Sequence, residues 1–537
     1  MDLTLRDALC VLSKASPFSV KTLSDKPRDS LDDAKDWLYI EQDIERDFRK
    51  ILSTLVPGEI VFLCGSSGDG KSEILARCHE QYRNRVRFHL DGTHSFSPRQ
   101  SAIDALDQLF DESHAGSKPL AVGINIGMLA NYCKEGASRH SLVKYAIENF
   151  LNGKNTDTAY HFFDFENYPK FQFNTNSDSH SKFAKQLMMR LTEPSDKNPF
   201  YVLSQKDDLE QTDPLLSANF KLLALGCVQN AIIENMFKVR LIKDKFITAR
   251  ALLDFIYQLL LGNKYLPDNL FGASDNELIQ RMGDFDPALL HTRALDQFLL
   301  RFELGLPNVE LSVFIDHLQK NRLMPEFKGE VAVGAGSLIR LFYLLLDQSI
   351  GNNFHHQFTE DFVDELLDGY SKVWLLHNDY DGSSEAKLAL RPFYGNELIN
   401  GIYRYANRNA PWLQKGEVFL GKSGALQLAA PVEVKVNFAS IQCKTSASVS
   451  RFWASLKVSD KELEPIAVNL NLFELIFKLN RGYRPNKYDK SAVVLLDELV
   501  EKIREVAKQS SVLKIYENRR CYTARLDDDM IEIGGVA

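Results

Sequence analysis

The chain has 537 residues, of which 45% are hydrophobic and 25% charged, and its formal net charge is -8 at pH 7. A chain of this length is expected to form two to four domains of roughly 100–200 residues each. The acidic balance argues against a protein that binds DNA on its own through a basic face. It leaves room for a local basic patch or for a partner that contacts DNA.

No apolar run reaches the roughly 18 residues that a membrane-spanning helix needs, so we expect no membrane segment. The N-terminal residues include acids and lack a basic stretch before an apolar core, which argues against a signal peptide. The seven cysteines are scattered and form no Cys-x-x-Cys pair. This usage favours a cytoplasmic protein over a disulfide framework or a structural zinc site.

The first 55 residues or so have a helical pattern. Apolar residues recur there at spacings of three and four, which places them on one helical face. They are Trp37, Ile40, Ile44, Phe48 and Ile51. We assign residues 1–40 to an N-terminal helical segment.

From Gly58 onward, short apolar runs alternate with amphipathic segments. The predicted strands are "EIVFLC", "VRFHLD", "PLAVGIN" and "AYHFFDF". The predicted helices between them are "KSEILARCHEQY", "PRQSAIDALDQLFDESH", which has a proline at its start, and "SRHSLVKYAIENFLNG". Continuous apolar strands that alternate with helices predict a parallel sheet with helices on both faces. We place this α/β domain at 41–205.

The remainder of the chain divides into two further regions by pattern. Residues 206–410 are predicted to be helical, as a lid or interaction domain. Residues 411–537 contain strands such as "PVEVKVNFASIQC" and "CYTARLDDDMIEI" around a pair of helices, which predicts an α+β module.

The segment "GSSGDGKS" lies between the first predicted strand and the helix that follows it. It has the spacing G-x-x-x-x-G-K-S of a P-loop, and its residues are Gly65, Ser66, Ser67, Gly68, Asp69, Gly70, Lys71 and Ser72. Glycines allow backbone N–H groups to surround an anion, and the helix N-terminus adds positive potential. We therefore expect a P-loop NTPase fold that binds ATP, with Lys71 on the β- and γ-phosphates and Ser72 on Mg²⁺.

Hydrolysis needs a further acid near the magnesium, and the sequence offers alternatives. Asp91 ends the strand "VRFHLD" and is a candidate for Mg²⁺ binding together with Ser72. Asp164 and Glu166, in "HFFDFEN", end another strand and are alternative catalytic acids. Asp111 in "LFDE" resembles such an acid as well, but the apolar spacing around it is helical.

Two further polar residues are candidates for contact with the γ-phosphate. Asn125 ends the strand "PLAVGIN", where it could polarise the attacking water or be an ordinary turn residue. Arg250, in the helix "ITARALLDFIY" of the predicted lid, could couple hydrolysis to lid movement or be a surface residue. Separately, "RGYRPNKYDK" at 481–490 mixes basic and aromatic residues, which suits either a nucleic-acid contact or a solvated loop.

Several segments resemble the DptF family, the ATPase components of the DNA phosphorothioation-dependent restriction system. They are "GEIVFLCGSSGDGKSEIL", "FHLDGTHSFSPRQSAIDALDQLFD", "PLAVGINIGMLANY", "YHFFDFENYPKFQF" and "ITARALLDFIY". The resemblance implies an ATPase subunit that acts with DptG- and DptH-like restriction subunits against unmodified DNA. It implies that DNA is contacted through the complex, and a homo-oligomer remains an open expectation.

Three functions are compatible with these observations. The first is an ATPase subunit of a restriction complex in anti-phage defence. The second is a nucleotide-gated switch or scaffold that binds ATP and hydrolyses little of it. The third, a small-molecule kinase, would need an acceptor pocket with a catalytic base, which the long helical and C-terminal regions do not favour.

Overall fold

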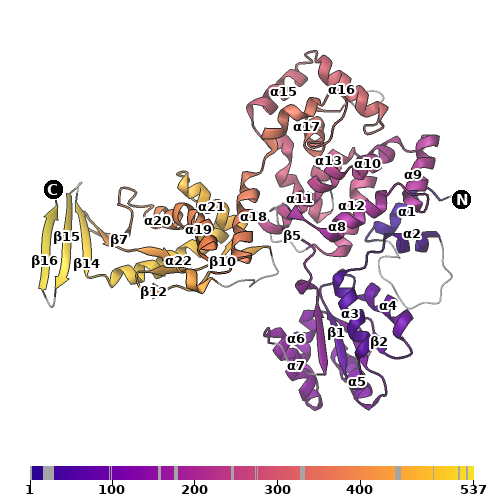
Figure 1. Cartoon of the computed structure of the whole chain (residues 1–537), viewed down its shortest axis with the longest axis horizontal. Helices are drawn as coiled ribbons and strands as arrows, with labels where there is room; N and C mark the ends of the chain where they lie inside the picture. Colours follow the sequence, from indigo (N-terminus) through magenta and orange to yellow (C-terminus); the bar gives the residue numbers. More distant parts are fainter. Residues whose placement is uncertain are drawn as a thin grey trace. The chain divides into compact units, whose positions relative to one another are not determined.

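The computed structural model describes residues 3–15, 30–95, 97, 99–154, 159–173, 179–243, 247–272, 274, 276–326, 333–441, 449–487, 489–517, 520–527 and 530–536. Backbone contacts divide the chain into two compact units (Figure 1). The first unit contains Met1–Gln172 and His180–Val363, and the second contains Phe173–Ser179 and Asp364–Ala537. The first unit therefore includes the predicted N-terminal segment, most of the predicted α/β domain and most of the predicted helical region.

A four-stranded parallel sheet lies within the first unit. Its strands are β1 (Ile60–Cys64), β2 (Arg87–His89), β3 (Leu120–Ile124) and β4 (Tyr160–Asp164), in the order β2-β3-β1-β4. Cys64, the last residue of β1, is the register partner of Ile124 in β3 and of Asp164 in β4. The carboxyl ends of the strands thus share one edge of the sheet, and the predicted parallel sheet is confirmed.

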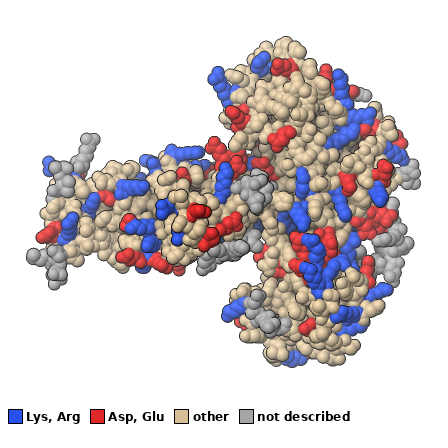
Figure 2. Space-filling model, viewed as in Figure 1, with Lys and Arg blue, Asp and Glu red and all other residues tan. Residues whose placement is uncertain are grey.

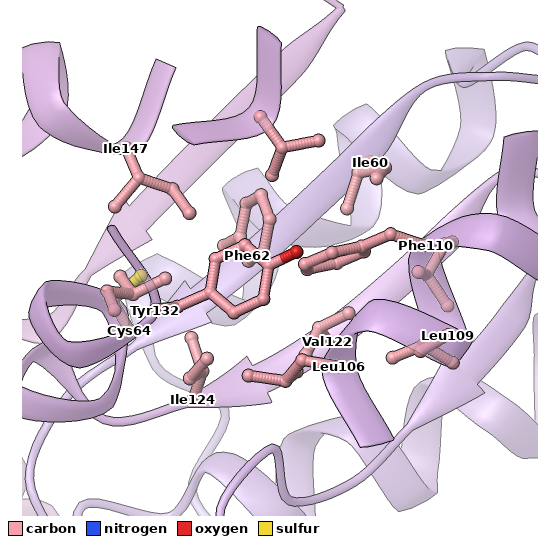
Figure 3. Close-up of a cluster of buried hydrophobic side chains, with 13 residues drawn as sticks. Ile60, Phe62, Cys64, Leu106, Leu109, Phe110, Val122, Ile124, Tyr132 and Ile147 are labelled. Carbon is pink, nitrogen blue, oxygen red and sulfur yellow. The ribbon is translucent and has the colours of Figure 1, made fainter. Parts of the chain in front are cut away.

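Helices cover both faces of this sheet, because alternate residues of β1 point to opposite sides. These helices are α3 (Asp43–Thr54), α4 (Lys71–Tyr82), α5 (Ala102–Ala115), α6 (Ile126–Glu135) and α7 (Ser141–Leu151). On one face Phe62 packs with Phe110 and Tyr132 from α5 and α6 (Figure 3). On the other face Val61 and Leu63 pack in a cluster with residues of α3 and α4.

The structure differs from two local expectations. The helical pattern over 30–55 is two helices, α2 (Ser30–Leu38) and α3, because the backbone is extended at Gln42, which caps α3. Helix α5 begins at Ala102 rather than at the proline, because Ser101 and Asp104 form a reciprocal capping box that satisfies the first free N–H groups.

The rest of the first unit is helical. Ahead of α2 it contains α1 (Leu5–Leu9) and the short 3-10 helix η1 (Cys10–Leu12). After the sheet come α8 (Lys182–Thr192), α9 (Pro199–Glu210), α10 (Pro214–Ala224), α11 (Gly226–Ile242), α12 (Ala249–Leu261), α13 (Leu266–Phe271), α14 (Glu277–Met282), α15 (Arg293–Glu303), α16 (Val309–Lys320) and α17 (Ala335–Leu344).

Among the residues that the structure describes, no single helix is long and apolar enough to cross a membrane. One bent pair, α10 with α11, meets the same criteria, with an angle of 81° between the two helices.

The second unit combines helices with antiparallel sheets, as the strand and helix patterns of the C-terminal region predict. Its helices are α18 (Glu365–Asn378), α19 (Ser384–Pro392), α20 (Ile399–Ala406), α21 (Leu470–Asn480) and α22 (Lys490–Lys508). Its largest sheet has the order β16-β15-β14-β8-β7. These strands are β7 (Glu417–Ser423), β8 (Leu426–Pro431), β14 (Val512–Glu517), β15 (Arg520–Asp527) and β16 (Met530–Val536).

Candidate functional site

The loop Gly65–Gly70 connects the end of β1 to the start of α4. Gly68 and Gly70 have positive φ angles of +88° and +105°, and Gly70 is the residue that caps α4. L-residues with side chains rarely adopt this region, so these two positions favour glycine. At Gly65, an added Cβ would lie 2.8 Å from the ring of Phe165. The backbone of this loop therefore depends on glycine, and the loop ends at a helix N-terminus.

Lys71, the first residue of α4, is directed back to the loop. Its Nζ donates hydrogen bonds to the carbonyl oxygens of Gly65 at 2.9 Å and Ser66 at 2.8 Å, and to Oδ1 of Asn125 at 2.8 Å. Burial lowers the pKa of Lys71, and the nearby carboxylates of Asp69 and Asp91 offset part of that effect. The ammonium group is thus held among acceptors at the carboxyl edge of the sheet.

Asp69 fixes the conformation of the loop from within. Its Oδ2 accepts a hydrogen bond from the N–H of Ser66 at 2.8 Å, and its Oδ1 pairs with Nζ of Lys170 at 2.9 Å. The side chains of Asp69 and Lys170 are only 1% and 7% exposed. A buried pair of this kind is tightly constrained, because each charge would be costly without the other.

A cavity of about 550 Å³ adjoins the loop. Eight of the residues selected from the sequence line it, namely Ser67, Gly68, Gly70, Lys71, Ser72, Asp91, Asn125 and Arg250. The fold therefore brings residues from four separate segments to one place. Asp164 and Glu166 are not among the lining residues.

Asp91 follows β2 and is held in a tight turn. Its Oδ1 accepts hydrogen bonds from the N–H and the hydroxyl of Thr93, at 2.9 and 2.6 Å, and its Oδ2 lies 3.0 Å from Nδ1 of His94. Partial burial acts to raise the pKa of Asp91, but the bonds from Thr93 and His94 outweigh it and keep the pKa below its usual range. Asp91 is therefore an anion beside the cavity.

Asp164 and Glu166 are placed differently. Asp164 ends β4 and accepts a hydrogen bond from the N–H of Glu166 at 3.0 Å. Burial raises the pKa of Asp164; the hydrogen bond from the Glu166 N–H opposes this effect, and the carboxylates of Glu166 and Asp69 add to it. Glu166 itself is exposed. Neither residue lines the cavity that Lys71 and Asp91 line.

Asn125 and Arg250 approach the loop from two sides. Asn125 follows β3 directly and contacts Lys71, as described above. The backbone N–H of Arg250, in the first turn of α12, donates to the carbonyl of Gly68 at 3.0 Å. Helix α12 is thereby joined to the loop through the main chain, and Arg250 is among the residues that line the cavity.

Some residues at the site were not identified from the sequence. The role of Thr93 could have been found, because an Asp with Thr two residues later commonly forms such a turn. Lys170 could not, because its partner Asp69 is 101 residues away in the chain. Tyr39 is also among the lining residues, and the guanidinium of Arg77 lies 3.6 Å from the centre of its ring.

The basic and aromatic segment 481–490 belongs to the second unit. The hydroxyl of Tyr483 donates a hydrogen bond to Asp489 at 2.8 Å. The ammonium of Lys478 lies 5.7 Å from the centre of the Tyr483 ring. Tyr488 lies outside the described residues. The described part is a locally bonded turn, and whether it contacts nucleic acid stays a prediction.

The residues around the cavity suit a hard cation held together with an anion. Over the described ranges, no group of three or more His, Cys, Asp or Glu side chains is arranged to hold a metal ion by itself. Ser72, which carries a hydroxyl, and Asp91, which carries a carboxylate, both line the cavity. Mg²⁺ prefers such oxygen ligands, few from the protein and the remainder from water and phosphate.

Comparison of the chain with protein-family models, curated proteins and solved structures gives no match.

Proposed function

We propose that the first unit contains a P-loop ATPase site centred on Gly65–Ser72. The observation that carries this proposal is the position of the Lys71 ammonium. It lies among the loop carbonyls and Asn125, beside a cavity that Ser72 and Asp91 also line. A cation, a glycine-rich turn and a helix N-terminus lie together there, and each of the three favours a bound anion.

Each residue has a definite task in this proposal. Backbone N–H groups of the loop and Lys71 bind the phosphates, and Lys71 exchanges its bonds to loop carbonyls for phosphate oxygens. Ser72 and Asp91 hold Mg²⁺, which supplies charge stabilisation to the phosphates. Asn125 orients water near the γ-phosphate, and Arg250 contacts the phosphates from α12.

The resemblance to the DptF family supports a biological setting for this ATPase. We propose a cytoplasmic subunit that acts with DptG- and DptH-like partners to control attack on unmodified DNA. The net charge of -8 supports DNA contact through those partners. On the face drawn in Figure 2, basic side chains are interspersed with acidic ones.

One observation favours a second candidate, a nucleotide-gated switch with little hydrolysis. Of the three predicted acids, only Asp91 lines the cavity, and it is already bonded to Thr93 and His94. Glu73, the other acid that lines the cavity, is paired with Lys35 at 3.1 Å and Arg77 at 2.8 Å. A site whose carboxylates are engaged in this way can bind Mg²⁺ and nucleotide while activating water poorly.

The substitution Lys71→Ala tests the proposal. We expect it to reduce ATP binding measured by calorimetry, to abolish phosphate release, and to abolish restriction of unmodified DNA in cells that carry the partner subunits. Lys50→Ala is the matched control, since the Lys50 side chain is 75% exposed on α3. If Lys71→Ala keeps both ATP binding and restriction, the proposal is wrong.

A second pair of variants separates the ATPase from the switch. Asp91→Asn is expected to bind ATP but to lose Mg²⁺-dependent phosphate release, whereas Asp164→Asn is expected to retain it. Tight ATP binding by the unmodified protein with negligible release, even with partners and DNA present, would instead support the switch.

A further inference from the structure

The cavity beside the loop has a second, apolar kind of lining. These residues come from distant parts of the first unit, namely Val11, Leu12, Leu38, Ile40, Phe183, Leu187 and Leu253. A phosphate chain is fully hydrophilic and gains nothing from such walls. A ligand that fills this cavity must therefore have an apolar part as well as an anionic part.

A purine base attached to the phosphates meets this requirement. Burial of apolar surface is worth roughly 25 cal/mol per Å², and the two fused rings of a purine offer more surface than one ring. We propose that Leu12, Phe183 and Leu253 bind the purine base of the nucleotide whose phosphates bind Gly65–Ser72. This inference rests on the proposed ATP site and names the class of its substrate.

An aromatic side chain at the cavity wall is fixed before any ligand binds. The hydroxyl of Tyr39 donates to the buried Glu45, and the guanidinium of Arg77 lies 3.6 Å from the centre of the Tyr39 ring. Arg77 is itself paired with Asp36 at 2.6 Å and with Glu73 at 2.8 Å. The wall at Tyr39 is therefore rigid, which reduces the entropy lost when a flat base binds.

The N-terminal part of this wall is attached to α12. The backbone N–H of Lys14 donates to Oδ1 of Asp254 at 3.0 Å, and Oδ2 of Asp254 accepts from Asn276 at 2.8 Å. Asp254 is the neighbour of Leu253 in the chain. A base in the cavity would thus contact η1 and α12 together. The affinity for the nucleotide would therefore depend on the N-terminal residues that form η1.

Ligand competition on the full chain in the presence of Mg²⁺ tests this assignment. ATP and GTP are expected to bind at least about tenfold more tightly than inorganic tripolyphosphate. The affinity for CTP is expected to lie between that for ATP and that for tripolyphosphate. ATP, but not tripolyphosphate, is expected to slow amide exchange at Leu12 and Ser13. Equal affinities for ATP and tripolyphosphate would overturn the base site and leave the phosphate site standing. Failure of every one of these ligands to bind would overturn the phosphate site as well.

Variants at the apolar wall give a second test that is independent of the loop. Phe183→Ala and Leu253→Ala, both at partly exposed positions, are expected to weaken ATP binding about fivefold to tenfold and to leave tripolyphosphate binding unchanged. Met189→Ala is the control for Phe183→Ala, since Met189 lies on the same helix, is 54% exposed and does not line this cavity. Wild-type ATP affinity in both wall variants would overturn the base site.

Discussion

Asp69 and Lys170 form an ion pair in which both side chains are almost fully buried. The Asp69 carboxylate also accepts a hydrogen bond from the N–H of Ser66, so the ion pair also stabilises the conformation of the loop. Removal of one partner from a buried pair leaves the other charge without compensation, which typically costs 3–5 kcal/mol. This pair is therefore the residue-level feature on which the loop conformation depends most directly.

We expect Lys170→Met to lower the free energy of unfolding by about 3 kcal/mol, measured by urea denaturation. Lys170→Arg keeps the positive charge and is expected to recover most of this loss. In the double variant Asp69→Asn, Lys170→Met, neither position of the pair carries a charge, so its loss should be smaller than that of Lys170→Met alone. A Lys170→Met protein as stable as wild type would show that the pair contributes nothing to folding.

The buried Asp164 gives a dependence of stability on pH. Its pKa is raised in the folded protein, so the folded state holds this proton more tightly than the unfolded chain does. The contribution of Asp164 to stability is therefore fully present below its unfolded pKa of about 3.9 and is lost as pH rises through the folded pKa.

Asp164→Asn removes this ionisation, and an amide oxygen can still accept the N–H of Glu166. We expect the variant to gain stability relative to wild type as pH is raised from 3 to 7, measured by denaturation at each pH. Parallel pH profiles for the two proteins would contradict the raised pKa.

At the scale of the elements, α12 is attached to the loop at Gly68. An added Cβ at Gly68 would lie 3.1 Å from Cβ of Arg250 and 3.2 Å from Oγ1 of Thr248, which caps α12. The main-chain bond from Arg250 to Gly68 lies at the same contact. A larger residue there must move the helix, the loop or both.

Gly68→Ala is expected to destabilise the protein in two ways. The positive φ costs a residue with a side chain about 1–2 kcal/mol, and the contact with α12 adds to that. Gly58→Ala is a matched control, since Gly58 has a φ of +90° but no atom within 4 Å of an added Cβ. We expect Gly68→Ala to cost on the order of 1 kcal/mol more than Gly58→Ala and, unlike it, to weaken ATP binding. Equal losses in the two variants would show that the contact with α12 does not matter.

At the scale of the whole molecule, the chain passes from one unit to the other within a few residues. Phe171 packs on Phe237 in the first unit, with ring centres 5.4 Å apart. Phe173 packs on Trp374 and Tyr370 in the second unit, at 5.5 and 6.2 Å. Two aromatic residues that are separated by a single residue in sequence thus stabilise different units.

Hydrogen exchange resolved by segment checks this division. Phe173→Ala is expected to speed amide exchange in α18, because loss of a buried aromatic side chain costs about 3 kcal/mol, and to leave α11 unchanged. Phe171→Ala is expected to have the opposite pattern, with faster exchange in α11. The same pattern in both variants would contradict two separately stabilised units.

Local chemistry explains why much of the first unit could be predicted. The apolar runs predict β1, β3 and β4 closely, and the segment from Lys71 to Tyr82 is a helix as its period indicates. The break between α2 and α3 was missed, because the apolar spacing continues across the extended residue Gln42. The spacing of apolar residues shows which side chains are buried. It does not show whether those side chains belong to one helix or to two consecutive helices.

The sequence by itself determined the parallel sheet, the glycine-dependent loop and the presence of Lys71 and Ser72 at the start of α4. Those features depend on periodicity and turn chemistry over a few neighbouring residues. Only the tertiary structure decided that Asp91, rather than Asp164, shares a cavity with Lys71, and that Lys170 pairs with Asp69. Such pairings depend on how helices and strands pack, because packing brings together side chains that local patterns cannot relate.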